Sequence, residues 1–304
     1  MSLQPRVVQV YRRSEYEDLL TRHSTHRQAA FFLQSRSRSI EELAQRHAVV
    51  ERARDVSAAA IPAEWRRAEV ERRDLHHFRF APEDIVLVVG QDGLVANVAK
   101  YLDGQPVVGV NPDPERNPGV LVPHSPGAVK ALLGAVALGE QQVQRRTMVA
   151  VETDDGQSLR ALNEIYFGHR SHQSARYCLD TPDGRTERHS SSGLLAGTGT
   201  GATGWLRSVW QERGSRLVLP EPESASLCWF AREAWPSVST GADVTEGAIG
   251  PDAVLRLQSE SDGLVCFGDG IESDALRVDW GQSMTVRIDR QTLNLVAHWQ
   301  NAEH

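Results

Sequence analysis

The sequence predicts two kinds of structure in one chain: an α/β domain at the N-terminus and an all-β, sandwich-like domain at the C-terminus. The first sign is a strand–helix–strand pattern around the apolar run Ile85–Val89. The second is a change near Thr147, after which helical periodicity fades and short alternating segments follow one another. We expect residues 1–125 to form the α/β domain and residues 126–304 the β-rich domain, with a C-terminal tail that could pack back on the first.

The N-terminal region should begin with a strand and continue as helices. Val7–Val10 predicts the strand, and a helix-rich stretch follows to about Ala60. Ser39 and Glu42 fit a capping box, in which each side chain bonds a free amide at the helix start. The charged stretch Arg66–Arg73 is expected to lie on the surface.

The α/β prediction depends mainly on the residues from Ile85 to Val110. Ile85–Val89 is continuously apolar, which is typical of a strand buried on both faces of a parallel sheet. A glycine turn follows at Gly90–Gly93, and apolar residues then recur at helical spacing from Leu94. Pro106–Val110 gives the next strand, which completes a βαβ unit.

The C-terminal half contains short alternating segments separated by Asp-Gly pairs. The segments are Met148–Glu152, Ala175–Leu179, Ala253–Leu257 and Thr285–Ile288. Asp-Gly predicts hairpins because both residues tolerate a positive φ. Such pairs stand at 155–156, 183–184, 262–263 and 269–270.

The amino-acid composition and net charge exclude some classes of function. The 304 residues carry 33 basic and 40 acidic groups, a net charge of −7, without a basic region interleaved with aromatics. We therefore expect no nucleic-acid partner. No apolar run approaches membrane-spanning length, so we expect no membrane partner and a soluble, cytoplasmic protein. The three scattered cysteines and the histidines predict neither a disulfide scaffold nor a metal site.

The glycine turn after Val89 is the first candidate for chemistry. Gly90, Gln91, Asp92 and Gly93 stand where a buried strand ends and a helix begins, which is where α/β sheets bind phosphates. An acid there would repel phosphate unless it meets a hydroxyl or a metal. Asp92 is therefore a candidate to take a proton from a ribose hydroxyl, although a plain β-turn with a solvated Asp explains the same residues.

Two further segments follow in the second half. Asn163 and Glu164 could exchange hydrogen bonds with a ribose or a base edge, or form an ordinary polar pair at a strand end. Ser190–Trp205 holds five glycines and several threonines, which allows tight folding around a ligand and offers amides and hydroxyls to phosphate. A flexible glycine loop is the alternative.

Taken in order, these segments resemble the NAD kinase family, and its mitochondrial-type branch most of all. The family has a GGDGT turn, a strand ending in GxN, an Asn-Glu pair and a Gly/Thr-rich signature. The corresponding segments here are Gly90–Leu94, Gly109–Asn111 with the following Pro-Asp-Pro-Glu-Arg, Asn163–Glu164 and Ser191–Gly201. The resemblance runs from the first strand to Asp269-Gly270.

The resemblance implies an NAD kinase-like fold with a dinucleotide site between the domains. It also implies transfer of the γ-phosphoryl group of ATP, with Mg²⁺, to the 2′-hydroxyl of the adenosine ribose of NAD. Asp92 would be the general base or a ribose-orienting carboxylate. Substrate binding would fall to Gly93, Asn163, Glu164, Thr203, Gly204, Trp205 and Ser208. The phosphates and ATP would meet Gly90, Gln91, Asn111, Thr198, Gly199, Thr200 and Gly201. The family also implies a homodimer or a larger homo-oligomer.

Two departures from the family pattern bear on activity. Gln91 replaces the second glycine of GGDGT, and Leu94 replaces its threonine. If the glycine serves a positive φ or a close phosphate, Gln91 adds strain or bulk. A non-catalytic NAD(P)-binding regulatory protein on the same fold is therefore the alternative. A lipid kinase is a third interpretation, since those families share a GGDGT-like turn, but the Asn163-Glu164 pair and the Thr-Gly-Thr-Gly signature weigh against it. The sequence does not decide between ATP and polyphosphate as donor, or between NAD and NADH as acceptor.

Overall fold

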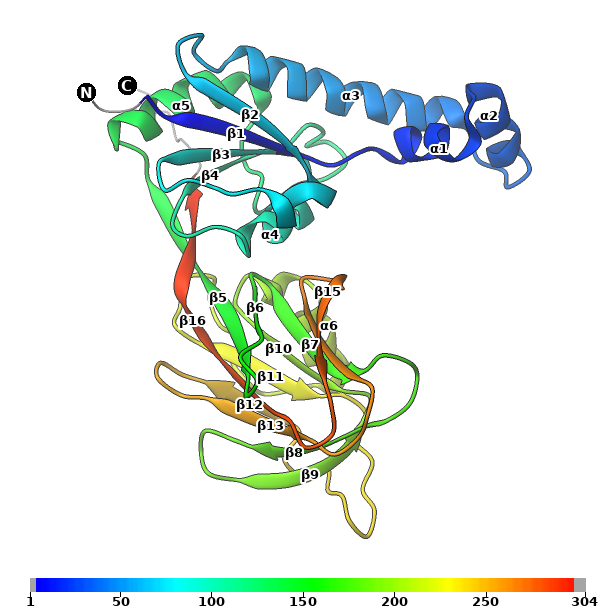
Figure 1. Cartoon of the computed structure of the whole chain (residues 1–304), viewed down its shortest axis with the longest axis vertical. Coiled ribbons are helices and arrows are strands. Elements are labelled where there is room, and N and C mark those ends of the chain that lie inside the picture. The colour runs from blue at the N-terminus through cyan, green and yellow to red at the C-terminus, as the bar shows by residue number, and fades with distance from the viewer. Residues whose placement is uncertain (1–3, 298–304) are drawn as a thin grey trace. The chain divides into compact units, whose positions relative to one another are not determined.

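The computed structural model describes residues 4–297, which form two compact units (Figure 1). Unit 1 takes in the chain up to Gln144 and again from Asn294 onward, and unit 2 takes in Arg145–Leu293. Unit 1 is α/β and unit 2 is dominated by antiparallel strands. The predicted fold class is confirmed.

Unit 1 is built on a parallel sheet. Its order is β2 (Arg66–Glu71), β1 (Arg6–Tyr11), β3 (Asp84–Val89) and β4 (Pro106–Val110). The end of β16 (Ser283–Val296) continues the sheet, because Asn294 and Leu295 pair with the start of β4. All six residues of β3 are buried, as expected of a strand covered on both faces.

Unit 1 also contains helices, of which the first two pack with the start of the third rather than on the sheet. They are α1 (Glu15–His23), α2 (His26–Gln34), α3 (Ile40–Ala59), α4 (Asp92–Ala99) and α5 (Val129–Leu138), with short 3₁₀ turns at Arg72–His77 and Pro126–Ala128. Helices α3 and α5 share one apolar core with β1, β3 and β4. Helix α4 lies on the other face of the sheet (Figure 1).

Three local features of unit 1 differ from the sequence expectation. Ser39 caps α3 by accepting from the backbone amides of Glu41 and Glu42, but its hydroxyl donates to the carboxylate of Glu41 rather than to that of Glu42. The reciprocal capping box forms instead at Ser14 and Glu17. The charged stretch from Arg66 forms strand β2, which is an edge strand because only one of its sides is paired. Val70 is the buried residue of this strand.

The division of the chain falls after Gln144, about 19 residues later than the expected boundary. Helix α5 lies between the two positions, and its apolar residues pack on the sheet of unit 1. The end of β16 also belongs to unit 1. Most of the expected C-terminal tail, residues 298–304, lies outside the described residues.

Unit 2 packs two sheets face to face. One contains β16, β13 (Leu255–Ser259), β8 (Ala175–Asp180) and β9 (Thr186–Ser191), and β5 (Val143–Thr153) pairs with both β16 and β6 (Ser158–Ala161). The other runs in the order β12 (Glu246–Ile249), β11 (Leu227–Ala231), β10 (Leu194–Gly197), β7 (Glu164–His169), β14 (Leu264–Gly268) and β15 (Ile271–Val278).

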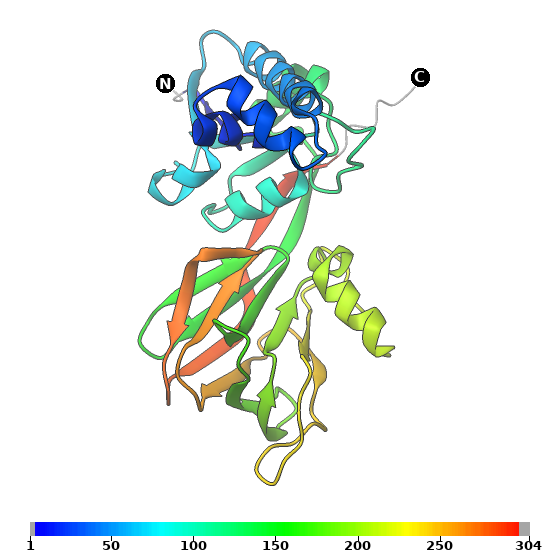
Figure 2. The same ribbon diagram turned by 90° about the vertical axis from the view of Figure 1, so that its right-hand side faces the viewer.

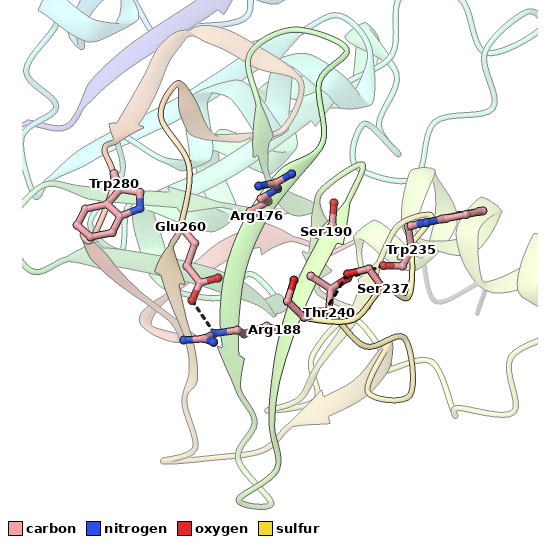
Figure 3. A pocket seen from close by; sticks show the side chains of 9 residues that line it. Arg176, Arg188, Ser190, Trp235, Ser237, Thr240, Glu260 and Trp280 are labelled. Carbon is pink, nitrogen blue, oxygen red and sulfur yellow. Dashed lines mark hydrogen bonds and ion pairs between the residues drawn. The ribbon is translucent and has the colours of Figure 1, made fainter.

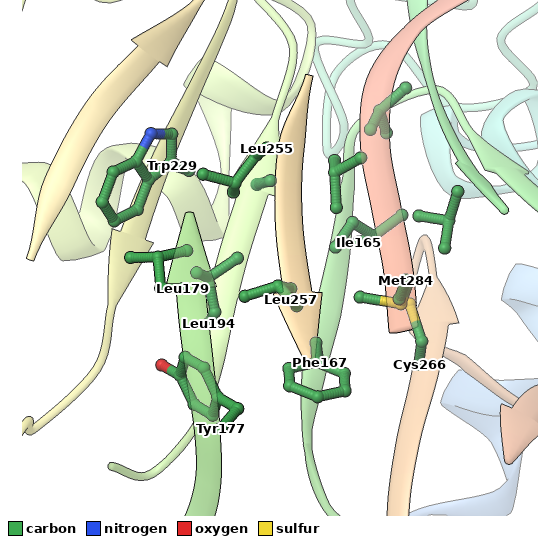
Figure 4. Packing of buried hydrophobic residues seen from close by; sticks show 14 of the residues in the cluster. Ile165, Phe167, Tyr177, Leu179, Leu194, Trp229, Leu255, Leu257, Cys266 and Met284 are labelled. Carbon is green, nitrogen blue, oxygen red and sulfur yellow. The ribbon is translucent and has the colours of Figure 1, made fainter. Parts of the chain in front are cut away.

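The core of unit 2 lies between these sheets, where Trp229, Phe167, Tyr177, Leu257 and Met284 are buried (Figure 4). Helix α6 (Trp205–Arg213) packs on the outer face of β10 and β11 (Figure 2). The short 3₁₀ turn Gly201–Thr203 leads into it.

Three of the four predicted Asp-Gly hairpins are confirmed: β5–β6, β8–β9 and β14–β15. The fourth prediction is wrong, because Asp262-Gly263 joins β13 to β14, which lie in different sheets. Gly263 still has a positive φ of 73°. The turn therefore has the expected positive φ, but the two strands that it joins pair with other strands of the two sheets.

Candidate functional site

The predicted turn of unit 1 places Asp92 as the first residue of α4. Its two carboxylate oxygens accept hydrogen bonds from the backbone amides of Val120 and Leu121, both at 2.8 Å. The negative charge also lies at a helix N-terminus, where the helix dipole favours it. Asp92 thus ties α4 to the loop that follows β4. Each oxygen keeps a second lone-pair site for another donor.

Gln91 and Leu94 adopt ordinary conformations. Gln91 is the exposed N-cap residue of α4 with φ −102°, so the strain considered from the sequence is absent at this position. Leu94 is 5% exposed and covers Gly90, where an added Cβ would lie 3.0 Å from its Cδ2. Leu94 is therefore a core residue that needs a small neighbour at position 90, while Gly93 is exposed beside it.

The GxN segment supports the same loop. An added Cβ at Gly109 would lie 2.0 Å from the carbonyl oxygen of Leu121, so only glycine allows this approach. Asn111 is buried, and its Nδ2 donates to the carbonyl oxygen of Asn117 at 2.6 Å. The predicted residues Gly90, Asp92 and Asn111 are thus all linked to β4 or to the loop after it.

The Asn-Glu pair of unit 2 lies at the start of β7, with its backbone bonded on both sides. The amide of Thr198 donates to the carbonyl oxygen of Asn163 at 2.9 Å, and the Thr198 hydroxyl donates to that of Leu162 at 2.6 Å. From the other side, Asp269 accepts from the amides of Leu162 and Asn163 at 2.9 and 2.7 Å. We call Leu162–Glu164 the clamped turn.

The side chains of the clamped turn are available to a ligand. Within residues 4–297, neither the Asn163 amide group nor the Glu164 carboxylate makes a side-chain hydrogen bond, and both residues are half-buried. Burial, and secondarily the charge of Asp269, raise the pKa of Glu164 to about 7. A fixed backbone that carries unbonded polar side chains is the arrangement expected of a preorganised binding site.

The Gly/Thr segment has a buried first part and an exposed second part. Thr198, Gly199, Thr200 and Gly201 are buried, and an added Cβ at Gly201 would lie 2.3 Å from the Asn163 carbonyl oxygen. The buried part of the segment therefore packs directly against the backbone of the clamped turn. Thr203, Gly204 and Ser208 are exposed and Trp205 is half-buried, so these four lie where a ligand can reach them.

Sequence reasoning missed an aromatic group beside this segment. Tyr166 of β7 stacks on Trp205 with ring centroids 5.7 Å apart and also contacts Phe267 at 5.1 Å. The guanidinium of Arg232 lies 5.4 Å from the Trp205 ring centroid. The alternation along β7 could have placed Tyr166 on the outer face, but its partners come from distant segments. The group offers flat apolar surface and a cation to a base or nicotinamide ring.

Two other features of the described residues lie elsewhere. A cavity of about 490 Å³ in unit 2 is lined by residues that include Arg176, Arg188 and Trp280, and Ser190 is its one contribution from the predicted ligand-binding segments (Figure 3). Arg188 forms an ion pair with Glu260, which also lines the cavity. Among residues 4–297, Glu17, His47 and Glu51 could approach one cation, but Glu17 is taken up by the Ser14 cap.

Comparison with known proteins adds an independent observation. The chain matches no protein-family model. It is 23% identical over 219 residues to an NAD kinase of Chlorobaculum tepidum, covering 71% of this chain and 72% of that protein. It is 30% identical over 185 residues to the mitochondrial NAD kinase 2 of Rattus norvegicus, covering 46% of this chain and 44% of the rat protein. The chain is thus similar in sequence to NAD kinases.

Solved structures of NAD kinases share the fold. A yeast NADH kinase complexed with NADH superposes with a TM-score of 0.59 at 14% identity, over 99% of this chain and 85% of that one. An NAD kinase from Archaeoglobus fulgidus in complex with ATP gives 0.57 at 16% identity, over 96% and 93%. At these identities the likeness establishes an NAD kinase-like fold. In the part of the chain that is described, no helix is both long and apolar enough to span a membrane.

Proposed function

We propose that the chain is an NAD kinase, which uses ATP with Mg²⁺ to phosphorylate the 2′-hydroxyl of the adenosine ribose of NAD and so forms NADP. The observation that carries the proposal is the clamped turn. Its backbone is bonded from both sides, while within residues 4–297 the side chains of Asn163 and Glu164 make no hydrogen bond. Similarity in sequence to named NAD kinases supports the proposal.

Asp92 is proposed to accept the proton of the ribose 2′-hydroxyl or to orient that hydroxyl. Its two amide bonds fix the position of the carboxylate, and its remaining lone pairs can accept from a hydroxyl. Gly90, Gln91 and Gly93 would place amides of the turn beside phosphate at a helix start. Asn111 holds the neighbouring loop.

In unit 2, Asn163 and Glu164 are proposed to bind the ribose and adenine parts of NAD. The exposed residues Thr203, Gly204 and Ser208 and the ring of Trp205 would contact the rest of the dinucleotide. The buried part of the segment, from Thr198 to Gly201, would act through the shape it gives the turn. Mg²⁺ would enter as part of the ATP substrate, where it neutralises phosphate charge.

The test is formation of NADP by the pure full-length chain with NAD, ATP and Mg²⁺. We expect NADP to accumulate with time and enzyme concentration, and NADH and polyphosphate should be run in parallel to define acceptor and donor. A chain with a cooperative unfolding transition that yields no NADP(H) with any of these donors and acceptors would refute the kinase proposal. Sedimentation of the same sample tests the homodimer that we propose, and fractionation of source cells tests the proposed cytoplasmic location.

A second candidate is an NAD(P)-binding regulatory protein without turnover. The observation that favours it is that the Asp92 carboxylate already accepts two backbone bonds, while Leu94 fills the core where the family has a hydroxyl. Calorimetry that shows NAD or NADP binding by a protein without activity would support this candidate. Turnover that Asp92→Asn abolishes would exclude it.

A further inference from the structure

Asp269 occupies the β14–β15 hairpin and reaches back across the sheet to the clamped turn. One of its oxygens accepts from the amide of Leu162 at 2.9 Å, and the other accepts from that of Asn163 at 2.7 Å and, more weakly, from that of Glu164 at 3.4 Å. In return, the amide of Asp269 donates to the carbonyl oxygen of Glu164 at 3.0 Å. A single residue thus satisfies three successive amides from more than 100 positions away.

The backbone around Asp269 is shaped for this reach. Asp269 has a φ of 53°, a left-handed conformation that Asp and Asn adopt more readily than most residues. The preceding Gly268 lies so close to Ala161 that an added Cβ would be 2.7 Å from the alanine Cβ. Hairpin and turn are therefore packed directly together, and the hydrogen bonds do not depend on a long flexible side chain.

Thr198 fixes the clamped turn from the side opposite to Asp269. Asp269 takes the amides of the clamped turn, whereas Thr198 donates to its carbonyl oxygens at Leu162 and Asn163. The Thr198 hydroxyl also accepts from the amides of Thr200 and Gly201. The backbone that carries the Asn163 and Glu164 side chains is consequently hydrogen-bonded on both sides, and its rotation is restricted.

We propose that Asp269, with Thr198 opposite, is a positioning residue that holds Asn163 and Glu164 in the orientation that binds the ribose and adenine of NAD. This inference rests on the proposed function for its ligand. Asp269 acts through the backbone of the turn, so it is not assigned a contact with the substrate. Charge-assisted bonds from a carboxylate to backbone amides are about twice as strong as neutral ones, which explains an acid at this position.

The same carboxylate sets the electrostatics of Glu164. Asp269 is the charged group whose field acts on Glu164, and Gly197 of β10 and Gly201 of the following 3₁₀ turn also lie close to the Glu164 side chain. Burial and this neighbouring charge both oppose ionisation of Glu164. Loss of the Asp269 charge should therefore lower the pKa of Glu164, which a purely structural anchor would leave unchanged.

The test compares Asp269→Asn with Asp262→Asn, which changes an exposed acid in another Asp-Gly turn of the same unit. Asparagine keeps the left-handed backbone, but its NH₂ group faces an amide that needs an acceptor. We expect faster hydrogen exchange at Leu162, Asn163 and Glu164, NAD affinity lower by about 10-fold or more, and a pH midpoint for NAD binding that moves toward acid. Asp262→Asn should match the wild type in all three.

Thr198→Val provides a second variant, because it removes the hydroxyl from the other side of the turn and keeps its shape. We expect the same loss of exchange protection and of NAD affinity, without the acid shift. Unchanged exchange at the three amides in Asp269→Asn would overturn the inference even if the wild type bound no NAD. A wild type that fails to bind NAD while Asp269→Asn loses protection would instead count against the proposed function, and unchanged affinity despite lost protection would overturn the positioning role.

Discussion

Asp92 in unit 1 and Glu164 in unit 2 are both acids beside a turn, yet their carboxylates have different neighbours. Asp92 accepts two backbone amides of its own unit at 2.8 Å. Glu164 accepts none among the described residues, and burial raises its pKa to about 7. Asp92 is thus fixed by its two hydrogen bonds. The Glu164 side chain makes no hydrogen bond within residues 4–297, and its pKa of about 7 places it close to its titration point at neutral pH. The difference suggests chemistry for the first and ligand binding for the second.

The largest effect is expected from Asp92→Asn. The amide removes the proton acceptor and faces one backbone N–H with a second donor, so we expect the rate of NADP formation to fall by roughly 10²- to 10⁴-fold. The loss of the loop bond should also lower the free energy of unfolding by about 1–3 kcal/mol. Steady-state kinetics and denaturant titration measure the two effects.

The matched control for this change is Asp103→Asn, an exposed acid in the same unit. It should behave as the wild type in both assays. If Asp92→Asn loses stability but retains full turnover, Asp92 is an anchor of the loop only, and the catalytic role proposed for it is wrong.

A smaller effect is expected from Glu164→Gln on the pH dependence of stability. The pKa of Glu164 rises from 4.5 to about 7 on folding, so its contribution to stability is present below pH 4.5 and is lost as the pH rises through about 7. The Gln variant lacks this loss. Its stability relative to the wild type should therefore increase across this window, by roughly 3 kcal/mol at most.

Urea unfolding at several pH values measures this relative stability, with the exposed Glu212→Gln as control. A wild-type minus variant difference that stays flat between acid and neutral pH would show that Glu164 ionises normally. The contrast drawn with Asp92 would then lose its electrostatic part.

The smallest effects concern the two departures from the family turn. Leu94→Thr restores the family residue but places a hydroxyl in the core, so we expect a loss of about 1–3 kcal/mol in the free energy of unfolding and no gain in rate. Gln91→Gly changes an exposed N-cap residue and should alter stability by only a few tenths of a kcal/mol. A rate that increases in Leu94→Thr would show that the missing hydroxyl limits catalysis.

The sequence could predict those parts of the molecule that depend on local pattern. The buried run before Gly90 identified the central strand, and three Asp-Gly pairs identified hairpins, because period and turn chemistry are local. Edge strand β2 was missed because only Val70 of its six residues is buried, so its charged residues look like a surface segment.

The support of the candidate site could not be read from the sequence for a different reason. Asp269 looked like an ordinary hairpin residue, and its partners at the clamped turn are more than 100 residues away. Likewise, the threonine at 198 was expected near phosphate, whereas its hydroxyl is buried and bonds Leu162. Residues that act by holding others leave little local signal, since their function lies in long-range contacts.

The most direct test of the account is calorimetric titration of NAD into the wild type, Asp92→Asn and Glu164→Ala, with NADP formation measured on the same samples. The account predicts that Asp92→Asn binds NAD within a few fold of the wild type but makes almost no NADP, while Glu164→Ala loses most of its affinity. Wild-type affinity in Glu164→Ala, together with lost affinity in Asp92→Asn, would contradict the division between a binding acid in unit 2 and a reacting acid in unit 1.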